Sequence, residues 1–184
     1  MRPKVLAVSL AGVVGAAALA CLVVFALSAP VEGLSMDPAL APGDRVLANP
    51  FGDRAPDRLD VVSVHPPRSS VTAVKRVVGL PGDRVRVHGG RVLVRPAGRD
   101  DWLAVSYSRA APGQCCAADG RAGADADAVV PPGHYFVLGD NLGASTDSRS
   151  YGFVAAADVV GVVALRVWPS VGAPDRPSLT PATG

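Results

Sequence analysis

The feature that most constrains this chain is an uncharged, apolar run near its N-terminus. Val5 through Val31 contain no Asp, Glu, Lys or Arg. A helix over this run, at about 1.5 Å per residue, is longer than the roughly 30 Å hydrocarbon core of a bilayer. The run therefore predicts one transmembrane anchor, which we place at residues 5–31.

Charges at the two ends of this run predict its orientation. Arg2 and Lys4 precede the run, whereas the acidic Glu32 follows it. Basic residues are enriched on the cytoplasmic side of membrane spans. We therefore expect a single-pass protein of the cell membrane, with residues 1–4 in the cytoplasm and the domain after the anchor outside it.

A cleaved secretory signal is the alternative interpretation of the run. The segment Ala26–Ala29 does resemble a small-residue cleavage site. However, the apolar core of a secretory signal spans only about 7–15 residues. The greater length of this run favours an anchor that is retained, and N-terminal sequencing of the mature protein distinguishes the two.

The part of the chain that follows the anchor predicts one domain of the mainly β class. About 150 residues are enough for a single hydrophobic core. Glycine and proline are frequent and the apolar residues are largely valine, which favours short strands over long helices. We expect a partly open, barrel-like antiparallel sheet over residues 32–169. A net charge of +2 without a basic stripe gives no indication of a nucleic-acid partner.

Alternating apolar residues indicate where the strands lie. Residues 84–88 alternate basic residues with valine, and after Gly89-Gly90 the chain returns as the valine-rich segment 91–95, which predicts a hairpin with one buried and one solvated face. Residues 96–133 are mostly small or polar, so we expect a loop-rich insertion there. Residues 170–184 predict a disordered tail.

Cysteine usage gives no indication of a metal site. Cys21 lies within the anchor, and Cys115 and Cys116 are adjacent. Adjacent cysteines seldom bridge each other without strain, and the sequence has no C-x-x-C pair or Cys/His ligand set. We expect neither a metal nor a cofactor, and the redox state of the adjacent pair stays open.

A lysine inside an apolar strand is the strongest chemical signal in the domain. Lys75 and Arg76 are neighbours in the strand-like segment 71–78, and strand alternation places them on opposite faces. A lone lysine in a strand usually lies on a solvated face, but here both faces cannot be solvated without loss of the core. We therefore expect one of the two cations in apolar surroundings. Burial lowers the pKa of a lysine, and a neutral lysine can take a proton from serine, whereas arginine cannot.

Ser35 is the candidate nucleophile for such a base. It lies just after the anchor, between Gly33-Leu34 and Met36-Asp37-Pro38. The hydrolase patterns G-x-S-x-G, S-x-x-K and H-E-x-x-H are absent from the sequence. Three histidines border turns or prolines, which makes a histidine base the weaker hypothesis: they are His65, His88 and His134.

Five segments after the anchor resemble, in order, the conserved boxes of type I signal peptidases. They read SMDPAL, GDRVLAN, LDVVSVHPP, VKRVVGLPGD and GDNLGASTDSRSYGFV. Members of this family are membrane-bound Ser/Lys endopeptidases that remove signal peptides from exported preproteins. The resemblance covers the anchor and most of the domain, and it fails in the 96–133 insertion and in the tail.

The resemblance implies roles for residues in three of these segments. Ser35 matches the nucleophile and Lys75 the general base. Ser145 would hydrogen-bond the lysine amine and orient it. Asp147 and Arg149 would form a supporting ion pair beneath the site. Without the resemblance, the segment around Ser145 would be interpreted only as turn chemistry.

Three further residues belong to the implied site. Asp140 and Asn141 begin the turn of the last segment. Gly33 occupies a position where some family members carry a serine that contributes to the oxyanion hole. Because this chain lacks that hydroxyl, stabilisation of the oxyanion would fall on the backbone N–H of Ser35.

The resemblance also implies partners. They are signal peptides of exported preproteins, the lipid bilayer and, indirectly, the protein translocation machinery. A cleavage site with small residues would lie extended along a sheet edge and place alternate side chains in two shallow apolar pockets. Four residues match pocket-lining positions and have ordinary core packing as their alternative role: Val31, Met36, Leu40 and Val74.

Two other functions are compatible with the sequence. A dedicated maturation protease for a single exported precursor would use the same Ser/Lys chemistry. A non-catalytic, membrane-tethered β-domain that binds peptides would need neither residue of the pair. The presence of both Ser35 and Lys75 favours an enzyme.

Overall fold

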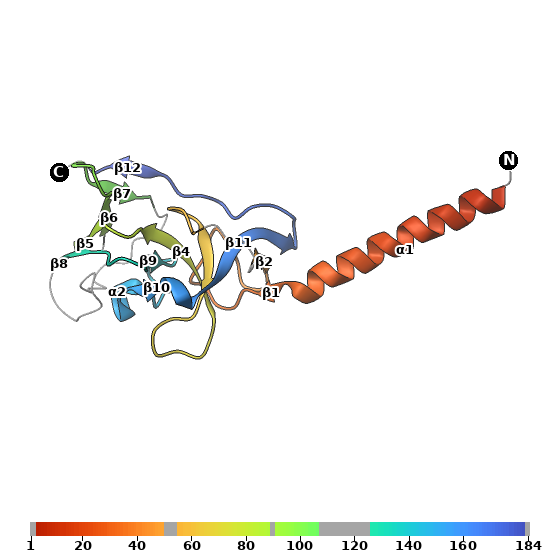
Figure 1. Cartoon of the computed structure of the whole chain (residues 1–184), viewed down its shortest axis with the longest axis horizontal. Helices are drawn as coiled ribbons and strands as arrows, with labels where there is room; N and C mark the ends of the chain where they lie inside the picture. Colours follow the sequence, from red (N-terminus) through yellow and green to blue (C-terminus); the bar gives the residue numbers. More distant parts are fainter. Residues whose placement is uncertain (1–2, 50–54, 89–90, 107–125, 183–184) are drawn as a thin grey trace.

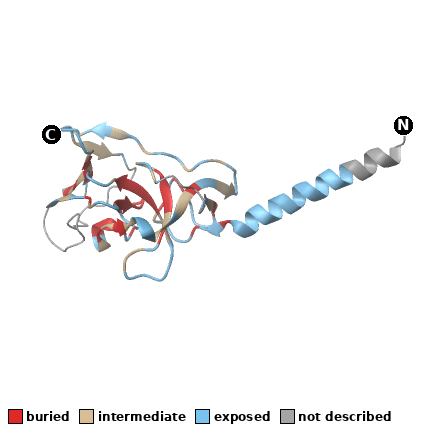
Figure 2. Cartoon of the chain, viewed as in Figure 1, coloured by how far each residue is buried: buried red, intermediate tan, exposed pale blue. Residues whose placement is uncertain are grey.

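A long helix projects from a β-rich body in the computed structural model, which describes residues 3–49, 55–88, 91–106 and 126–182 (Figure 1). The helix is α1 (Pro3–Leu27). Its segment Leu10–Leu27 is long and apolar enough to cross a membrane, and every side chain in it is exposed (Figure 2). Such an apolar, unpacked surface suits contact with lipid.

The β-rich body consists of two antiparallel sheets. The first sheet has the strand order β1-β2-β11-β3-β4-β9-β10, and the second has the order β12-β7-β6-β5-β8. The strands of the first sheet are β1 (Ala29–Pro30), β2 (Arg45–Asn49), β3 (Val61–Val64), β4 (Ala73–Gly79), β9 (His134–Leu138), β10 (Val154–Ala155) and β11 (Val159–Trp168). Those of the second are β5 (Arg84–His88), β6 (Arg91–Arg95), β7 (Leu103–Val105), β8 (Ala126–Val129) and β12 (Leu179–Pro181). Two short helical elements are α2 (Ser148–Tyr151) and the 3-10 helix η1 (Ala156–Asp158).

The predicted fold class is confirmed. Strand pairing is antiparallel throughout both sheets as described, and the seven-stranded sheet is open, with β1 and β10 at its two edges. The division into two sheets was not predicted from the sequence. Strand β1 follows α1 almost directly, so the helix ends before the end of the predicted 5–31 run. The reason is that residues 29 and 30 pair with β2.

The predicted hairpin is present as β5 and β6. Val85 pairs with Val94, and Val87 pairs with Val92. All four valines are buried, whereas the arginines of the two strands are partly or fully exposed. The valines belong to a core that joins the two sheets, because they pack with Phe136 of β9.

The ends of the predicted 96–133 insertion are strands of the second sheet. Strand β7 pairs with β6, and β8 pairs with β5. Residues 107–125, which include Cys115 and Cys116, lie outside the described residues. Within the part described, the insertion therefore contributes β7 and β8 to the second sheet, on opposite sides of the β5–β6 hairpin.

The prediction of a disordered tail is wrong for most of residues 170–184. Strand β12 pairs with β7, and Gly172 forms an isolated antiparallel bridge with Arg166 of β11. Arg76 donates to the backbone oxygen of Asp175 at 2.7 Å, and Arg176 forms an ion pair with Asp60. The tail has few apolar residues of its own. It is ordered because it pairs with an edge strand and with charged groups from distant parts of the chain, which local composition does not report.

Candidate active site

Ser35 lies in a tight turn between β1 and β2. The N–H of Leu40 donates to the oxygen of Met36 at 2.9 Å, which closes part of this turn. The N–H of Asn141 donates to the Ser35 oxygen at 3.0 Å, so the turn is attached to the loop after β9. Gly33 has φ +76°, a conformation that favours glycine. A serine at position 33, as in some family members, would therefore be strained in this chain.

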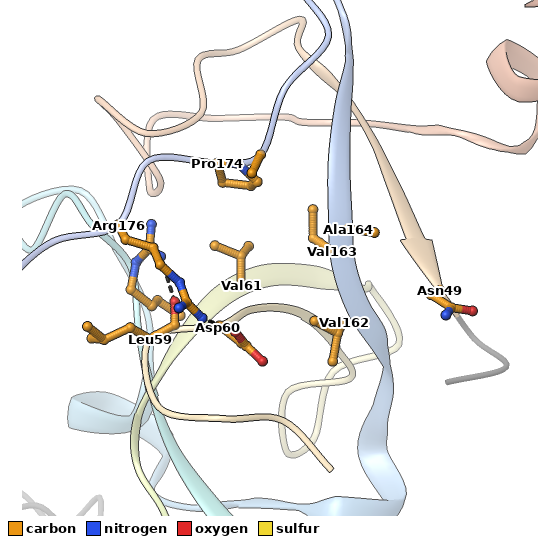
Figure 3. Close-up of a pocket in the computed structure, with 11 residues that line it drawn as sticks. Asn49, Leu59, Asp60, Val61, Val162, Val163, Ala164, Pro174 and Arg176 are labelled. Atoms are coloured by element: carbon orange, nitrogen blue, oxygen red, sulfur yellow. Dashed lines mark hydrogen bonds and ion pairs between the residues drawn. The ribbon is translucent and has the colours of Figure 1, made fainter. Parts of the chain in front are cut away.

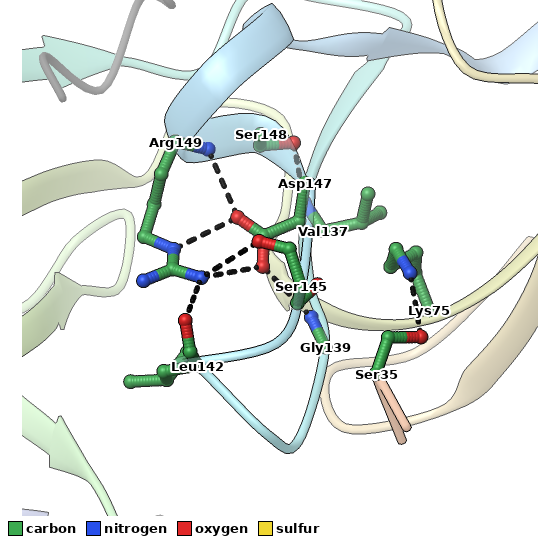
Figure 4. A network of polar contacts seen from close by, with 9 residues as sticks. All are labelled: Ser35, Lys75, Val137, Gly139, Leu142, Ser145, Asp147, Ser148 and Arg149. Atoms are coloured by element: carbon green, nitrogen blue, oxygen red, sulfur yellow. Dashed lines mark hydrogen bonds and ion pairs between the residues drawn. The ribbon is translucent and has the colours of Figure 1, made fainter. Parts of the chain in front are cut away.

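Lys75 reaches the Ser35 hydroxyl from strand β4. Its Nζ lies 3.0 Å from Ser35 Oγ, and the two side chains point toward one another (Figure 4). The Lys75 residue is only 4% exposed. The predicted nucleophile and base are thus brought together across the fold, although 40 positions separate them in the sequence.

The surroundings of Lys75 lower the pKa of its amine below the ordinary lysine value of 10.5. Burial is the main cause, because it disfavours the charged ammonium. Asp147 and Asp140 act in the opposite direction and raise the pKa, whereas the positive charge of Arg149 lowers it. The result is an amine that loses its proton more readily than a lysine in water.

Arg76, the neighbour of Lys75, is also buried. The sequence predicted one cation in apolar surroundings, but the structure buries both, with Arg76 at 0% exposure. Arg76 forms a bidentate pair with Asp140, at 2.7 Å from Nε and 2.6 Å from Nη2, and donates to the Leu59 oxygen at 2.8 Å. The guanidinium is tolerated because its charge and its donors are matched.

The predicted ion pair between Asp147 and Arg149 is present and buried. Arg149 Nε and Nη2 lie 2.8 and 3.0 Å from the two carboxylate oxygens. Arg149 also donates to the Leu142 oxygen at 2.7 Å and to the Ser145 oxygen at 3.3 Å (Figure 4). Arg149 therefore holds the loop of residues 139–147 in one conformation through these hydrogen bonds.

The predicted hydrogen bond between Ser145 and Lys75 is not formed in this structure. Ser145 is 8% exposed, and its Oγ is buried without a hydrogen-bond partner among the described residues. The hydroxyl lies against Gly139, where an added Cβ would overlap it. Arg149 donates to the Ser145 backbone oxygen. The position of the Ser145 hydroxyl therefore follows from the hydrogen bonds that hold the loop rather than from a bond made by the hydroxyl itself.

Gly139 is a site residue that sequence reasoning missed. A Cβ at this position would overlap both the Ser145 hydroxyl and the Ser35 oxygen. Its N–H also donates to Asp147 at 3.1 Å. Only a residue without a side chain allows the nucleophile turn to lie this close to the loop after β9. In the sequence, the Gly-Asp-Asn run signals a turn but not this close approach.

The four predicted pocket residues form one cluster. Val31, Met36 and Leu40 are buried, and Val74 packs against them from β4. Met36 and Leu40 are 1% and 0% exposed, so they are packed as core in the structure as it stands. Their role in substrate binding remains a prediction.

A separate cavity of about 520 Å³ lies between the first sheet and the C-terminal segment (Figure 3). Val61, Val162 and Val163 line it from β3 and β11, and Pro174 and Arg176 line it from the C-terminal segment. Neither Ser35 nor Lys75 belongs to its lining. This cavity is therefore not where the two reactive groups meet.

The chemistry available at the site is that of an alcohol beside a buried amine. No group of three or more His, Cys, Asp or Glu side chains suited to a metal occurs in the part of the chain that the structure describes. Among the described residues, the site brings together the Ser35 hydroxyl, the Lys75 amine, two buried ion pairs and backbone groups. This set can support nucleophilic attack by serine on a carbonyl carbon, with the amine as the proton acceptor.

Comparisons with known proteins show the family to which this chain belongs. Residues 4–168 match the family model described as "Signal peptidase, peptidase S26". A signal peptidase I of Bacillus caldolyticus is 36% identical over 148 residues, which cover 76% of this chain and 78% of that protein. Signal peptidase IB of Staphylococcus aureus is 33% identical over 146 residues and covers 76% of each chain.

One solved structure is also similar to this chain. It is a crystal structure of a signal peptidase I from Enterococcus faecalis, with 27% sequence identity and a TM-score of 0.44. The match covers 60% of this chain and 97% of that chain.

Proposed function

This chain belongs to the signal peptidase family, peptidase S26, and is a hydrolase that cleaves signal peptides; we propose that Ser35 and Lys75 carry out the cleavage. The observation that carries the proposal is the 3.0 Å distance between Lys75 Nζ and Ser35 Oγ. The lowered pKa of the buried amine supports it. The apolar helix α1 is consistent with membrane anchoring.

The first chemical step is proton transfer from the Ser35 hydroxyl to the neutral Lys75 amine. Oγ then attacks the carbonyl carbon of the scissile peptide bond and forms a tetrahedral intermediate. The Lys75 ammonium returns the proton to the leaving amine as the peptide bond breaks. A water molecule then hydrolyses the acyl-enzyme, with Lys75 again as base.

The negatively charged oxygen of the intermediate needs hydrogen-bond donors. In our proposal the backbone N–H of Ser35 supplies one of them. The turn that holds this N–H is fixed by the bond from Asn141 to the Ser35 oxygen, and by the close approach at Gly139. Preorganised donors of this kind lower the barrier because they do not reorient during the reaction.

The substrate would bind as an extended strand beside the nucleophile. Strand β1 is an edge of the first sheet, both of its residues are exposed, and it lies shortly before Ser35. A peptide added at such an edge places alternate side chains on one face. The cluster of Val31, Met36, Leu40 and Val74 would receive the small residues of the cleavage site.

We place the N-terminus in the cytoplasm and the β-rich body outside it. Arg2 and Lys4 before the apolar run support this orientation. The position of Ser35, shortly after the end of α1, would then put the nucleophile near the outer surface of the bilayer. A membrane-inserted signal peptide would end at this outer surface, and the translocation machinery would release the exported part of the preprotein there.

The test of the proposed dyad is cleavage of a preprotein by the full chain in detergent. We expect Ser35→Ala and Lys75→Ala each to abolish turnover, because each removes one reacting group. Ser69→Ala, an exposed serine in a loop, is the matched control and should cleave normally. Undiminished cleavage by either dyad variant would refute the proposal.

The breadth of the substrate set is a separate question. Depletion of the protein followed by profiling of exported proteins would show whether many precursors or one accumulate uncleaved. Many precursors would indicate a general signal peptidase, and one would indicate a dedicated maturation protease.

A further inference from the structure

The C-terminal end of α1 is capped by an arginine from the β-rich body. Helix α1 has no basic residue in its last turn, and the N–H of Ser28, just after the helix, donates to the oxygens of Val24 and Phe25 at 3.1 and 3.3 Å. Arg45 of β2 donates from Nη2 to the oxygens of Phe25 and Ser28, at 3.1 and 2.5 Å. Its Nε donates to Ser28 Oγ at 2.8 Å.

Two further contacts complete this joint. The Arg45 guanidinium carbon lies 4.1 Å from the centre of the Phe25 ring, which is a cation–π contact. Ser28 is 5% exposed, and its hydroxyl donates to the Phe25 oxygen at 2.7 Å. A single side chain thus contacts the last turn of the helix through one hydrogen bond and one ring face, and contacts Ser28, the residue after the helix, through two more hydrogen bonds.

The joint continues directly into the nucleophile turn. Pro30 of β1 pairs with Arg45, and the N–H of Val31 donates to the Asp44 oxygen at 2.8 Å. The short segment of residues 29–34 separates the joint from Ser35. The direction of α1 therefore determines where Ser35 lies relative to a bilayer that surrounds the helix.

We propose that Arg45 is a positioning residue that fixes the angle between the membrane anchor and the catalytic domain. It thereby holds Ser35 at a constant height above the bilayer and selects the peptide bond cut in a membrane-inserted substrate. This inference rests on the proposed function. A guanidinium suits the role because its planar donors bind two carbonyls and a hydroxyl together, whereas a lysine offers one compact charge.

The test compares two substrates of the same full-length enzyme. One is a preprotein inserted in the liposomes that hold the enzyme, and the other is a short soluble peptide with the same cleavage site, assayed in detergent. We expect Arg45→Gln to cleave the inserted preprotein about tenfold more slowly and at more than one bond, as mass spectrometry would show. Cleavage of the soluble peptide should stay within about twofold of normal, because the dyad is not altered.

Arg86→Gln is the matched control. Arg86 is also a half-exposed strand arginine, lies 4.3 Å from the centre of the Trp102 ring and pairs with Asp127, but it belongs to the second sheet. It should leave both assays unchanged. An equal loss on both substrates, or no loss on either, by Arg45→Gln would overturn the proposal.

Two further variants keep the result interpretable. Ser35→Ala should abolish cleavage of both substrates, and if it does not, the proposed dyad fails independently of Arg45. If Arg45→Gln does not fold, Phe25→Leu removes only the ring contact. It should show the same selective loss on the inserted preprotein to a smaller extent, and normal cleavage by it would overturn the proposal.

Discussion

At the scale of single residues, the proposed role of Lys75 as base depends on the removal of its ammonium from water. A buried carboxylate at hydrogen-bond distance would stabilise the ammonium and cancel this effect. Instead, the two nearby carboxylates are each bound by an arginine, Asp140 by Arg76 and Asp147 by Arg149. Pairing with guanidinium groups leaves the amine with the serine hydroxyl as its hydrogen-bond partner.

The rate of cleavage should rise with pH until the Lys75 amine is neutral. The pKa of this amine is lowered, so the rise should be complete before the ordinary lysine pKa of 10.5 is reached. The measurement is the pH dependence of kcat/KM for a soluble peptide in detergent. A rate that is already maximal at about pH 6 would contradict the role of Lys75 as base.

The same shift predicts how stability depends on pH. The unfolded chain binds more protons than the folded protein at pH values between the lowered pKa and 10.5, so stability rises with pH across that window. Lys75→Met should lack this rise, be inactive and be more stable at neutral pH by roughly 1 kcal/mol, because the desolvation cost is gone. Denaturant unfolding at several pH values checks this, and a less stable Lys75→Met protein at neutral pH would contradict it.

Gly139 should tolerate no side chain. Gly139→Ala would push the Ser35 oxygen and the Ser145 hydroxyl apart. We expect a loss of roughly 1–3 kcal/mol in the free energy of unfolding, typical of overpacking, and at least a tenfold loss of activity. Gly172→Ala, where a Cβ meets open space, is the control and should behave normally. Normal activity in Gly139→Ala would show that the turn can move without consequence.

At the scale of elements, the C-terminal segment is part of the catalytic domain although the family match ends at residue 168. It supplies the Asp175 oxygen to the buried Arg76, which in turn holds Asp140. The next residue, Asn141, donates to the oxygen of Ser35. The segment is therefore connected to the nucleophile through backbone and ion-pair contacts.

A chain that ends after Pro169 should be less stable and less active. It lacks β12 and leaves a buried donor of Arg76 without its partner, which costs roughly 1–3 kcal/mol for that group alone. Urea unfolding and peptide cleavage in detergent measure the two effects. A chain that ends after Ala182 keeps β12 and is the control. Equal stability of the two truncated chains would show that the segment contributes nothing.

At the scale of the whole molecule, α1 leads through β1 to the turn that holds Ser35, and the proposed orientation would place this turn near the outer surface of the membrane. In the proposed orientation, protease added outside intact cells stripped of their wall should digest the β-rich body and leave a fragment that contains α1. The same body in inverted membrane vesicles should be protected. Digestion in the inverted vesicles and protection in the stripped cells would reverse the proposed orientation.

Several features of this molecule were readable from the sequence because they depend on local patterns. The uncharged run predicts a long apolar helix over residues 5–31, of which the structure forms α1 as far as Leu27, and alternation predicts the hairpin of β5 and β6. Lys75 is recognisable in the sequence because burial of an ammonium in an apolar strand costs free energy, so a lysine at such a position indicates a function. The family resemblance then assigns Ser35 as its partner.

Other features were decided by tertiary structure alone. The order of residues 172–182, the close approach of Ser35 to Gly139 and the cap that Arg45 places on α1 all join segments that are distant in the sequence. Each depends on a backbone oxygen or on a close approach of main chains. The types of the residues involved do not reveal such contacts, because every residue has a backbone carbonyl. The chain's sequence by itself determined which groups could react, and the fold decided what holds them in place.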